Sequence, residues 1–214
     1  MSNNNAPFGL RQEQSATGAG SNFEMIYRQI AYDNATAIYT NDPVKQLDTG
    51  YIAQWSAGTA VSQMIGIFMG CEFLSALTGK MTSSPYWPGS GQVASTAQST
   101  IIAKIAPINL AIPSRFIVQS DATGVAFADI GMNIDLAMGT GSTITGISGA
   151  YLNLATLNTT ATLPFRIVGL YGGLPGAGGA GGIQPGSTGP YSGSATGAYN
   201  WAVVMSNNVG TTGI

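Results

Sequence analysis

The side chains that most often perform enzyme chemistry are scarce in this sequence. It contains no histidine, so the commonest general base and metal ligand is absent. The single cysteine, Cys71, lies in the apolar run 65–73 without an obvious base, which is typical of a buried structural thiol. Serines and threonines are common, but none lies in a GxSxG motif. We therefore expect no catalytic residues and no enzyme activity.

One cluster of Asp and Asn residues could supply oxygen ligands to a calcium ion. It comprises Asp121, Asp129, Asn133 and Asp135. Calcium requires six to eight oxygens in a tight loop, whereas the mostly even spacing of the last three favours a solvated strand face. Spacing alone does not rule out a glycosidase-type carboxylate pair, yet the acidic residues favour no particular pair. The expectation is that no metal is bound.

A glycine motif at 176–181 has the literal pattern GxGxxG. A dinucleotide site requires a strand before this motif and a helix opening at it. Here Pro175 precedes the motif and no helix-forming residues follow, so chance within a glycine-rich stretch explains it better. We expect no bound cofactor.

Charged residues make up only 7% of the 214 residues, where about 25% is typical. The seven basic residues are scattered singly from Arg11 to Arg166, and the net charge is −2, which disfavours nucleic-acid binding. A surface of small neutral polar groups is easily desolvated at an interface, although an ordinary soluble monomer is the alternative. The most apolar stretch, 60–77, includes Glu72 and is not expected to span a membrane.

Short apolar segments separated by turn residues predict an all-β sandwich or barrel from residue 23 onward. The segment 94–104 is compatible with helix or strand, and no repeat of fixed period is apparent. The expected strands are 23–31, 36–40, 44–47, 51–55, 64–73, 99–105, 115–119, 131–138, 150–154, 163–170 and 199–205.

Two segments fall outside this strand pattern. Residues 1–22 are polar around one apolar knot, Ala-Pro-Phe-Gly-Leu at 6–10, and form an extended N-terminal arm that orders only against a partner or its own domain. Residues 171–198 contain eleven glycines and are expected to form a long loop inserted before the last strand of a single 23–214 domain. The polar N-terminus lacks a signal peptide, which indicates synthesis in a reducing cytoplasm.

Six residues are candidates for an interface. Tyr86 and Trp87 lie between prolines in an expected loop, which is either a rigid projection for a partner or a loop folded over the core. In the arm, the candidates are Pro7, Phe8, Leu10 and Arg11.

Several motifs together resemble the capsid decoration (cement) proteins of tailed bacteriophages. The resemblance covers residues 6–170 and resumes at Tyr199, while the 107–113 stretch lacks the family's acidic turn and the 171–198 insertion is longer than usual. The motifs are Ala-Pro-Phe-Gly-Leu-Arg (6–11), Asn-Asp-Pro-Val (41–44), Ile-Gly-Ile-Phe-Met-Gly-Cys-Glu-Phe (65–73), Pro-Tyr-Trp-Pro-Gly (85–89), Phe-Ile-Val-Gln-Ser-Asp (116–121), Ala-Asp-Ile-Gly-Met-Asn-Ile-Asp-Leu (128–136), Gly-Thr-Gly-Ser-Thr (139–143) and Thr-Leu-Pro-Phe-Arg-Ile-Val-Gly-Leu (162–170).

The resemblance implies a structural virion protein on the outer face of an icosahedral capsid, made in the bacterial host cytoplasm. The expected partners are the major capsid protein and further copies of this chain, with a trimer favoured over a dimer. Linking several weak contacts would then clamp neighbouring capsid subunits. The alternative is a receptor- or glycan-binding module of a head fibre or tail adhesin, with the glycine-rich loop as its binding surface.

Overall fold

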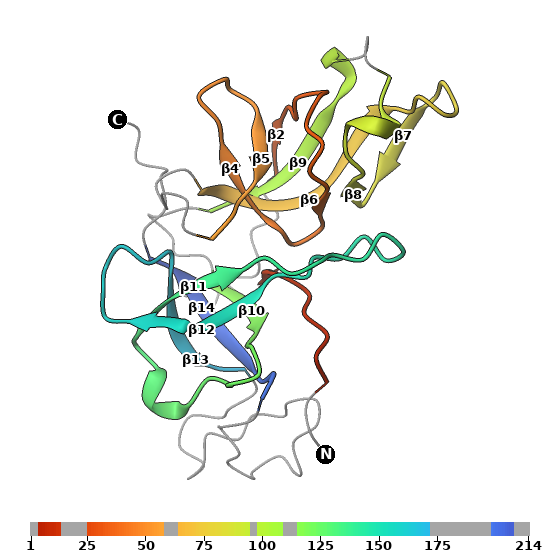
Figure 1. Ribbon diagram of the computed structural model, residues 1–214. Coiled ribbons are helices and arrows are strands. Elements are labelled where there is room, and N and C mark those ends of the chain that lie inside the picture. Colours follow the sequence, from red (N-terminus) through yellow and green to blue (C-terminus); the bar gives the residue numbers. More distant parts are fainter. Residues whose placement is uncertain are drawn as a thin grey trace.

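The computed structural model describes residues 4–13, 25–57, 64–94, 98–108, 115–171 and 198–207. These ranges consist mainly of β-strands, which confirms the all-β prediction (Figure 1). In chain order the elements are β1 (Arg11–Gln12), β2 (Ile26–Arg28), β3 (Ile38–Tyr39), β4 (Pro43–Gln46), β5 (Ile52–Gln54), β6 (Met64–Leu74), β7 (Met81–Ser84), β8 (Tyr86–Trp87), η2 (Ser90–Gln92), η3 (Gln98–Thr100), β9 (Ile102–Pro107), β10 (Arg115–Gln119), η4 (Phe127–Asp129), β11 (Asn133–Ala137), β12 (Tyr151–Asn158), β13 (Phe165–Leu170) and β14 (Trp201–Ser206).

Each strand expected from the sequence overlaps an observed strand. The ambiguous 94–104 segment contains the short 3-10 helix η3 and then enters β9, whose Ala103 and Ile105 are buried. Strands β7 and β8 were not expected, because Met-Thr-Ser-Ser lacks apolar alternation and the following Pro-Tyr-Trp reads as a loop. The glycine-rich loop predicted at 171–198 lies outside the described residues, apart from its two end residues.

The first unit of the fold is an antiparallel sheet with the strand order β2-β9-β6-β4-β5. Strand β7 pairs with β6 beyond this path, and β3 pairs with β8 in a separate two-stranded sheet. The sheet curls until its end strands meet at one parallel bridge between Ile30 and Ile52. One bridge does not close the sheet into a barrel.

The second unit is an antiparallel sheet with the order β1-β10-β14-β13-β11-β12. The five strands other than β1 also curl, and β12 meets the end of β10 at one parallel bridge, between Ser120 and Leu152. The N-terminal strand β1 is added to the outer edge of β10 (Figure 1).

The two units repeat the same architecture. When each unit's five strands are numbered in chain order, omitting β1, β3, β7 and β8, both sheets have the order 1-5-4-2-3 and a parallel bridge between strands 1 and 3. In both, the fourth strand carries a register shift that ends at a glycine, Gly70 or Gly169. Residues that lie opposite each other on neighbouring strands of the first unit have counterparts that lie opposite each other in the second unit. Given as first unit and then second unit, these pairs are Tyr27–Lys104 with Ile117–Val203, Gly70–Lys104 with Gly169–Val203, Val44–Gly66 with Ile134–Phe165, and Gln46–Ile52 with Leu136–Leu152.

This repeat is one of strand order and register, and it has no fixed period in the sequence. The sequence hides it because the connection between the second and third strands is longer in the second unit, so equivalent residues keep no fixed separation. The equivalent residues also differ in type, since a strand position requires only the right face and approximate volume.

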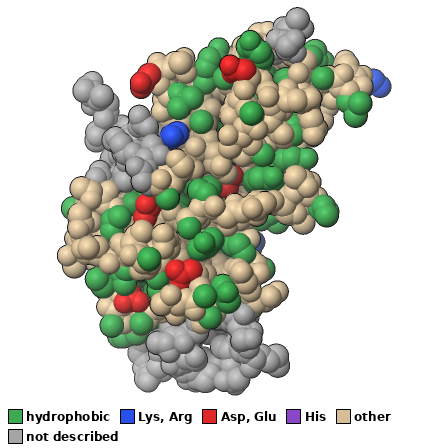
Figure 2. Space-filling view, viewed as in Figure 1, with side chains coloured by type: hydrophobic (Ala, Val, Ile, Leu, Met, Phe, Trp, Pro, Cys, Tyr) green, Lys and Arg blue, Asp and Glu red, His purple; other side chains and the backbone are tan. Residues whose placement is uncertain are grey.

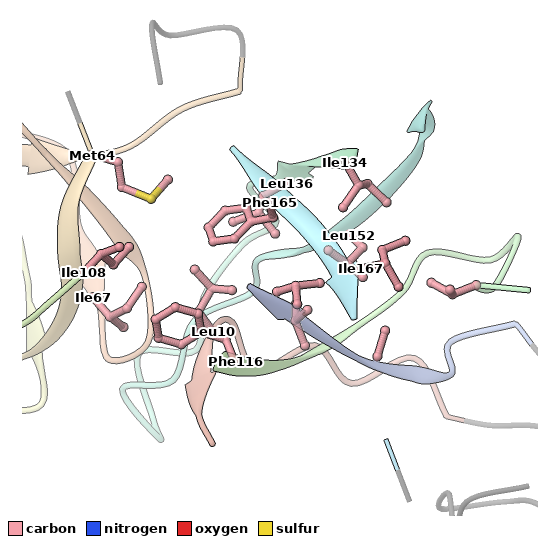
Figure 3. Close-up of a cluster of buried hydrophobic side chains, with 14 of the residues drawn as sticks. Leu10, Met64, Ile67, Ile108, Phe116, Ile134, Leu136, Leu152, Phe165 and Ile167 are labelled. Atoms are coloured by element: carbon pink, nitrogen blue, oxygen red, sulfur yellow. The ribbon is translucent and has the colours of Figure 1, made fainter. Parts of the chain in front are cut away.

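The core consists of two hydrophobic clusters, one shared by the two units and one inside the first unit. One cluster joins Met64, Ile67 and Ile108 of the first unit to Phe116 and Phe165 of the second (Figure 3). The other lies on the opposite face of the first sheet, because neighbouring side chains of a strand point to opposite faces. It includes Phe68, Cys71, Phe73 and Trp87.

A buried carboxyl group joins the units at a polar junction. Asp42 accepts hydrogen bonds from the Ser148 hydroxyl, from the Tyr39 backbone N–H at 2.8 Å and from the Gln54 amide at 2.7 Å. Ser148 belongs to the second unit and the other three residues to the first. Burial raises the pKa of Asp42, although these hydrogen bonds oppose the increase.

Candidate interaction surface

The N-terminal arm, residues 4–13, is attached along the second unit. Leu10 is buried in the cluster that joins the two units, next to Phe116 in Figure 3. The Gln119 side chain holds the arm's backbone by donating to the Asn4 carbonyl at 2.8 Å and accepting from the Ala6 N–H at 3.0 Å. The arm therefore orders against its own domain, one of the two possibilities that the sequence left open.

Leu10 is consequently not an exposed interface residue, which corrects its assignment from the sequence. Glycine at position 9 allows the chain to place Leu10 in this buried position. The φ of Gly9 is +75°, and a Cβ there would overlap the Asn41 carbonyl and the Ser148 side chain. Pro7 and Phe8 are half-buried, and Arg11 is exposed. Local hydrophobicity could not distinguish these cases, because burial depends on where β10 and its neighbours lie.

A surface groove of about 360 Å³ runs along the arm. The Phe8 and Trp201 rings meet edge to face at 5.1 Å, and Tyr171 lies 5.7 Å from Trp201. Arg11 and Glu13 line the same groove. Burial raises the pKa of Glu13, and the nearby Arg115 guanidinium opposes this increase. Aromatic faces beside charged groups are suited to binding an amphipathic partner.

The structure thus brings Phe8 and Arg11 together with five residues that were not interface candidates in the sequence analysis. These are Gln12, Glu13, Ile117, Tyr171 and Trp201. Tyr171 was the first residue of the predicted 171–198 loop and Trp201 lay within the expected strand 199–205, so the glycine-rich segment between them obscured their proximity. The Tyr171 N–H donates to the Trp201 carbonyl at 3.0 Å, so strand pairing is what aligns them.

The Tyr86–Trp87 pair lies on β8 and not in a projecting loop. Trp87 is fully buried: its indole N–H donates to the Asn34 carbonyl at 3.0 Å and its ring meets Phe73 edge to face. Its proposed role as an interface anchor is therefore wrong in this conformation. Tyr86 is half-buried and stacks on Tyr39 at 5.5 Å, away from the arm groove.

The acidic cluster noted in the sequence is distributed over separate structural roles. Asp121 accepts from the backbone of Thr123 and Leu154, and Asp129 accepts from Ala126. Asn133 and Asp135 are buried, which corrects the expectation of a solvated strand face: Ile134 and Leu136 between and after them are buried too, so both faces of β11 are covered. In the ranges that the structure describes, no group of three or more His, Cys, Asp or Glu residues is placed to hold a metal ion.

Comparison with known proteins identifies no relative. No protein-family model, curated protein or solved structure matches this chain. Among the described residues, no helix is long and apolar enough to cross a membrane. The GxGxxG pattern at 176–181 lies outside the described residues.

Cys71 is expected to be unreactive in the folded protein. It is buried, and burial raises the pKa of its thiol to about 12, so the reactive thiolate is scarce near neutral pH. Native protein treated with a thiol reagent at about pH 8, close to an ordinary thiol pKa, should remain unlabelled. The same protein should react fully once it is unfolded in urea, which serves as the control. Rapid labelling of native protein would contradict the buried position.

Proposed function

We propose that this protein is a non-enzymatic structural component of a bacteriophage virion. It binds the outer face of the icosahedral capsid and stabilises the capsid by bridging neighbouring major capsid proteins. The resemblance of its motifs to those of capsid decoration proteins supports this proposal. So does the low charge: in Figure 2, Lys, Arg, Asp and Glu side chains are scattered singly over the visible face.

The observation that carries the proposal is the exposure of large apolar side chains at separated tips of the fold. Leu77, in the turn between β6 and β7, is 91% exposed, and Ile144, in the connection between β11 and β12, is 95% exposed. Phe127 of η4 is exposed on another part of the second unit. Figure 1 shows the three elements projecting from different parts of the molecule.

Separated apolar tips suit a protein that contacts several neighbours at once. Burying one such side chain is worth roughly 1.5–3 kcal/mol, which is weak alone. When the contacts are made by one folded chain, each further contact is effectively intramolecular. Copies of this chain, arranged as a homo-oligomer and most simply as a trimer, would multiply these contacts across the shell.

The proposal predicts that substitutions at the tips weaken capsid binding without unfolding the protein. Leu77→Ser combined with Ile144→Ser should reduce cosedimentation with capsids stripped of decoration by at least about ten-fold, because each lost contact exceeds about 1.4 kcal/mol. The melting temperature should hardly change, since both side chains are exposed. Tyr32→Ser, a partly exposed position away from the tips, is the control. Normal decoration by the double variant would reject this mode of binding.

Copy number in purified virions separates this function from an adhesin. A decoration protein should be present in amounts comparable to the major capsid protein, whereas a head-fibre or tail adhesin occupies few positions. Restriction of the chain to the tail or to one vertex would overturn the proposal.

A further inference from the structure

The repeated architecture makes it possible to compare the same edge in both units. In the second unit, the outer edge of β10 is covered by the arm: Arg11 lies opposite Ile117 and Gln12 opposite Phe116. This pairing leaves Ile117 only 9% exposed and Gln119 only 2% exposed. Phe8 packs on Trp201 beside the same edge.

The equivalent edge of the first unit is β2. Strand register makes Tyr27 the counterpart of Ile117, and Gln29 the counterpart of Gln119, the residue that holds the arm's backbone. Tyr27 is 61% exposed and Gln29 is exposed. Within the described residues, β2 pairs only with β9, and the Gln29 side chain has no hydrogen-bond partner.

An open groove of about 550 Å³ lies beside this edge. It occupies the same place as the arm groove, because Tyr27, Glu72 and Ile102 are the counterparts of Ile117, Tyr171 and Trp201. The first unit therefore has the same edge, groove and glutamine that hold the arm in the second unit, but no described residue is docked there as a strand.

We propose that β2 and this groove bind an extended segment of another protein, which adds to the sheet as an antiparallel strand. Backbone hydrogen bonds along an exposed strand edge provide the affinity in such complexes, and side-chain pockets provide the selectivity. Among the described residues, the arm is the segment that adds to such an edge, and it occupies β10. We therefore assign the edge of β2 to a segment from outside the protomer.

The charges of the groove define the chemistry of the segment. Two of the seven basic residues of the chain, Arg28 and Lys104, line it, and Glu72 is paired with Lys104 at 2.6 Å. In the arm groove, by contrast, the strand itself supplies the arginine, Arg11, opposite Ile117. The segment that binds β2 thus carries a carboxylate near the position that Arg11 occupies in the arm.

The test uses labelled peptides and the full-length protein. One peptide is the arm sequence 4–13, Asn-Asn-Ala-Pro-Phe-Gly-Leu-Arg-Gln-Glu, and the other is the same peptide with Arg11→Glu. At low ionic strength, fluorescence anisotropy should show the acidic peptide binding about two- to five-fold more tightly, as one exposed charge pair allows. Amide NMR shifts should locate it on β2.

Receptor variants make the assignment specific. Arg28→Glu should reverse the preference between the two peptides, and Gln29→Ala should weaken both. Lys80→Glu, an exposed cation on a different hairpin, should change neither. A capsid is not required, so these results are independent of the proposed function.

Several outcomes would overturn the inference. These are an absence of binding by both peptides, binding that Arg28→Glu and Gln29→Ala leave unchanged, or NMR shifts confined to β10 through displacement of the arm. Concentration-dependent oligomers of the full-length protein that Arg28→Glu dissociates would show that a second copy is the occupant, which would refute the assignment to another protein.

Discussion

Replacing Leu10 by alanine is expected to lower the free energy of unfolding by about 2–5 kcal/mol, the usual cost of truncating a fully buried leucine. Leu10 is 1% exposed and packs in the cluster that joins the two units. Urea denaturation of the purified protein measures the change. Arg11→Ala is the matched control, because Arg11 is an exposed neighbour on the same arm and should change stability by less than about 0.5 kcal/mol.

Deleting residues 1–13 should destabilise the protein at least as much as Leu10→Ala. The deletion also removes β1 and leaves the buried Gln119 side chain without its partners on the arm. The sequence left open whether the arm orders against a partner or against its own domain, and this loss of stability is expected only if the arm orders against its own domain. A truncated protein that melts at the full-length temperature would show that the arm is not part of the folded core.

A pair of glycine variants tests whether the arm depends on the close approach of Gly9 to Asn41 and Ser148. Gly9 and Gly50 both have positive φ, at +75° and +86°, so alanine strains the backbone at either position. A Cβ at Gly9 would also overlap Asn41 and Ser148, whereas nothing lies within 4 Å of one at Gly50. Gly9→Ala should therefore be the more destabilising substitution. Equal effects would contradict the docked arm.

The second large effect is expected at Asp42. Asp42→Leu should cost several kcal/mol, because it leaves the Ser148 hydroxyl, the Gln54 amide and the Tyr39 N–H without their acceptor, at about 1–3 kcal/mol for each buried group. Asp42→Asn should cost much less. Its oxygen can accept from Tyr39 and Gln54 while its amide donates to Ser148, as a protonated carboxyl would.

The pH dependence of the two proteins should differ in a defined direction. Burial raises the pKa of Asp42 in the folded state above the unfolded value of about 3.9, so the folded protein retains the proton more strongly. Asp42 therefore contributes full stability below the unfolded pKa and loses it as pH rises through the folded pKa. Relative to Asp42→Asn, the wild type should become less stable across this window.

Urea denaturation of both proteins at intervals from about pH 3.5 to 7 measures this difference. Glu13, whose pKa is also raised, is present in both proteins, so its contribution cancels in the comparison. A stability difference that is constant with pH would show that Asp42 titrates alike in the folded and unfolded chains.

From the sequence alone, the positions of most strands and the scarcity of side chains that commonly perform catalysis could be predicted. Strand positions were predictable because alternation and turn residues are local signals, as in the 64–73 run that became β6. The burial of Cys71 was equally local, since Cys71 lies in the largely apolar run 65–73. Composition likewise indicated a sparsely charged surface.

Only the tertiary structure decided which apolar residues are exposed and which sheet edges are paired with a further strand. Leu10 and Trp87 have the sequence features of interface anchors, yet β10 and Phe73, distant in the chain, enclose them. The repeat of the two units resides in strand register, which depends on backbone pairing and tolerates changes of residue type. For the same reason, the correspondence between Gln29 and Gln119 became visible only once both sheets were assembled.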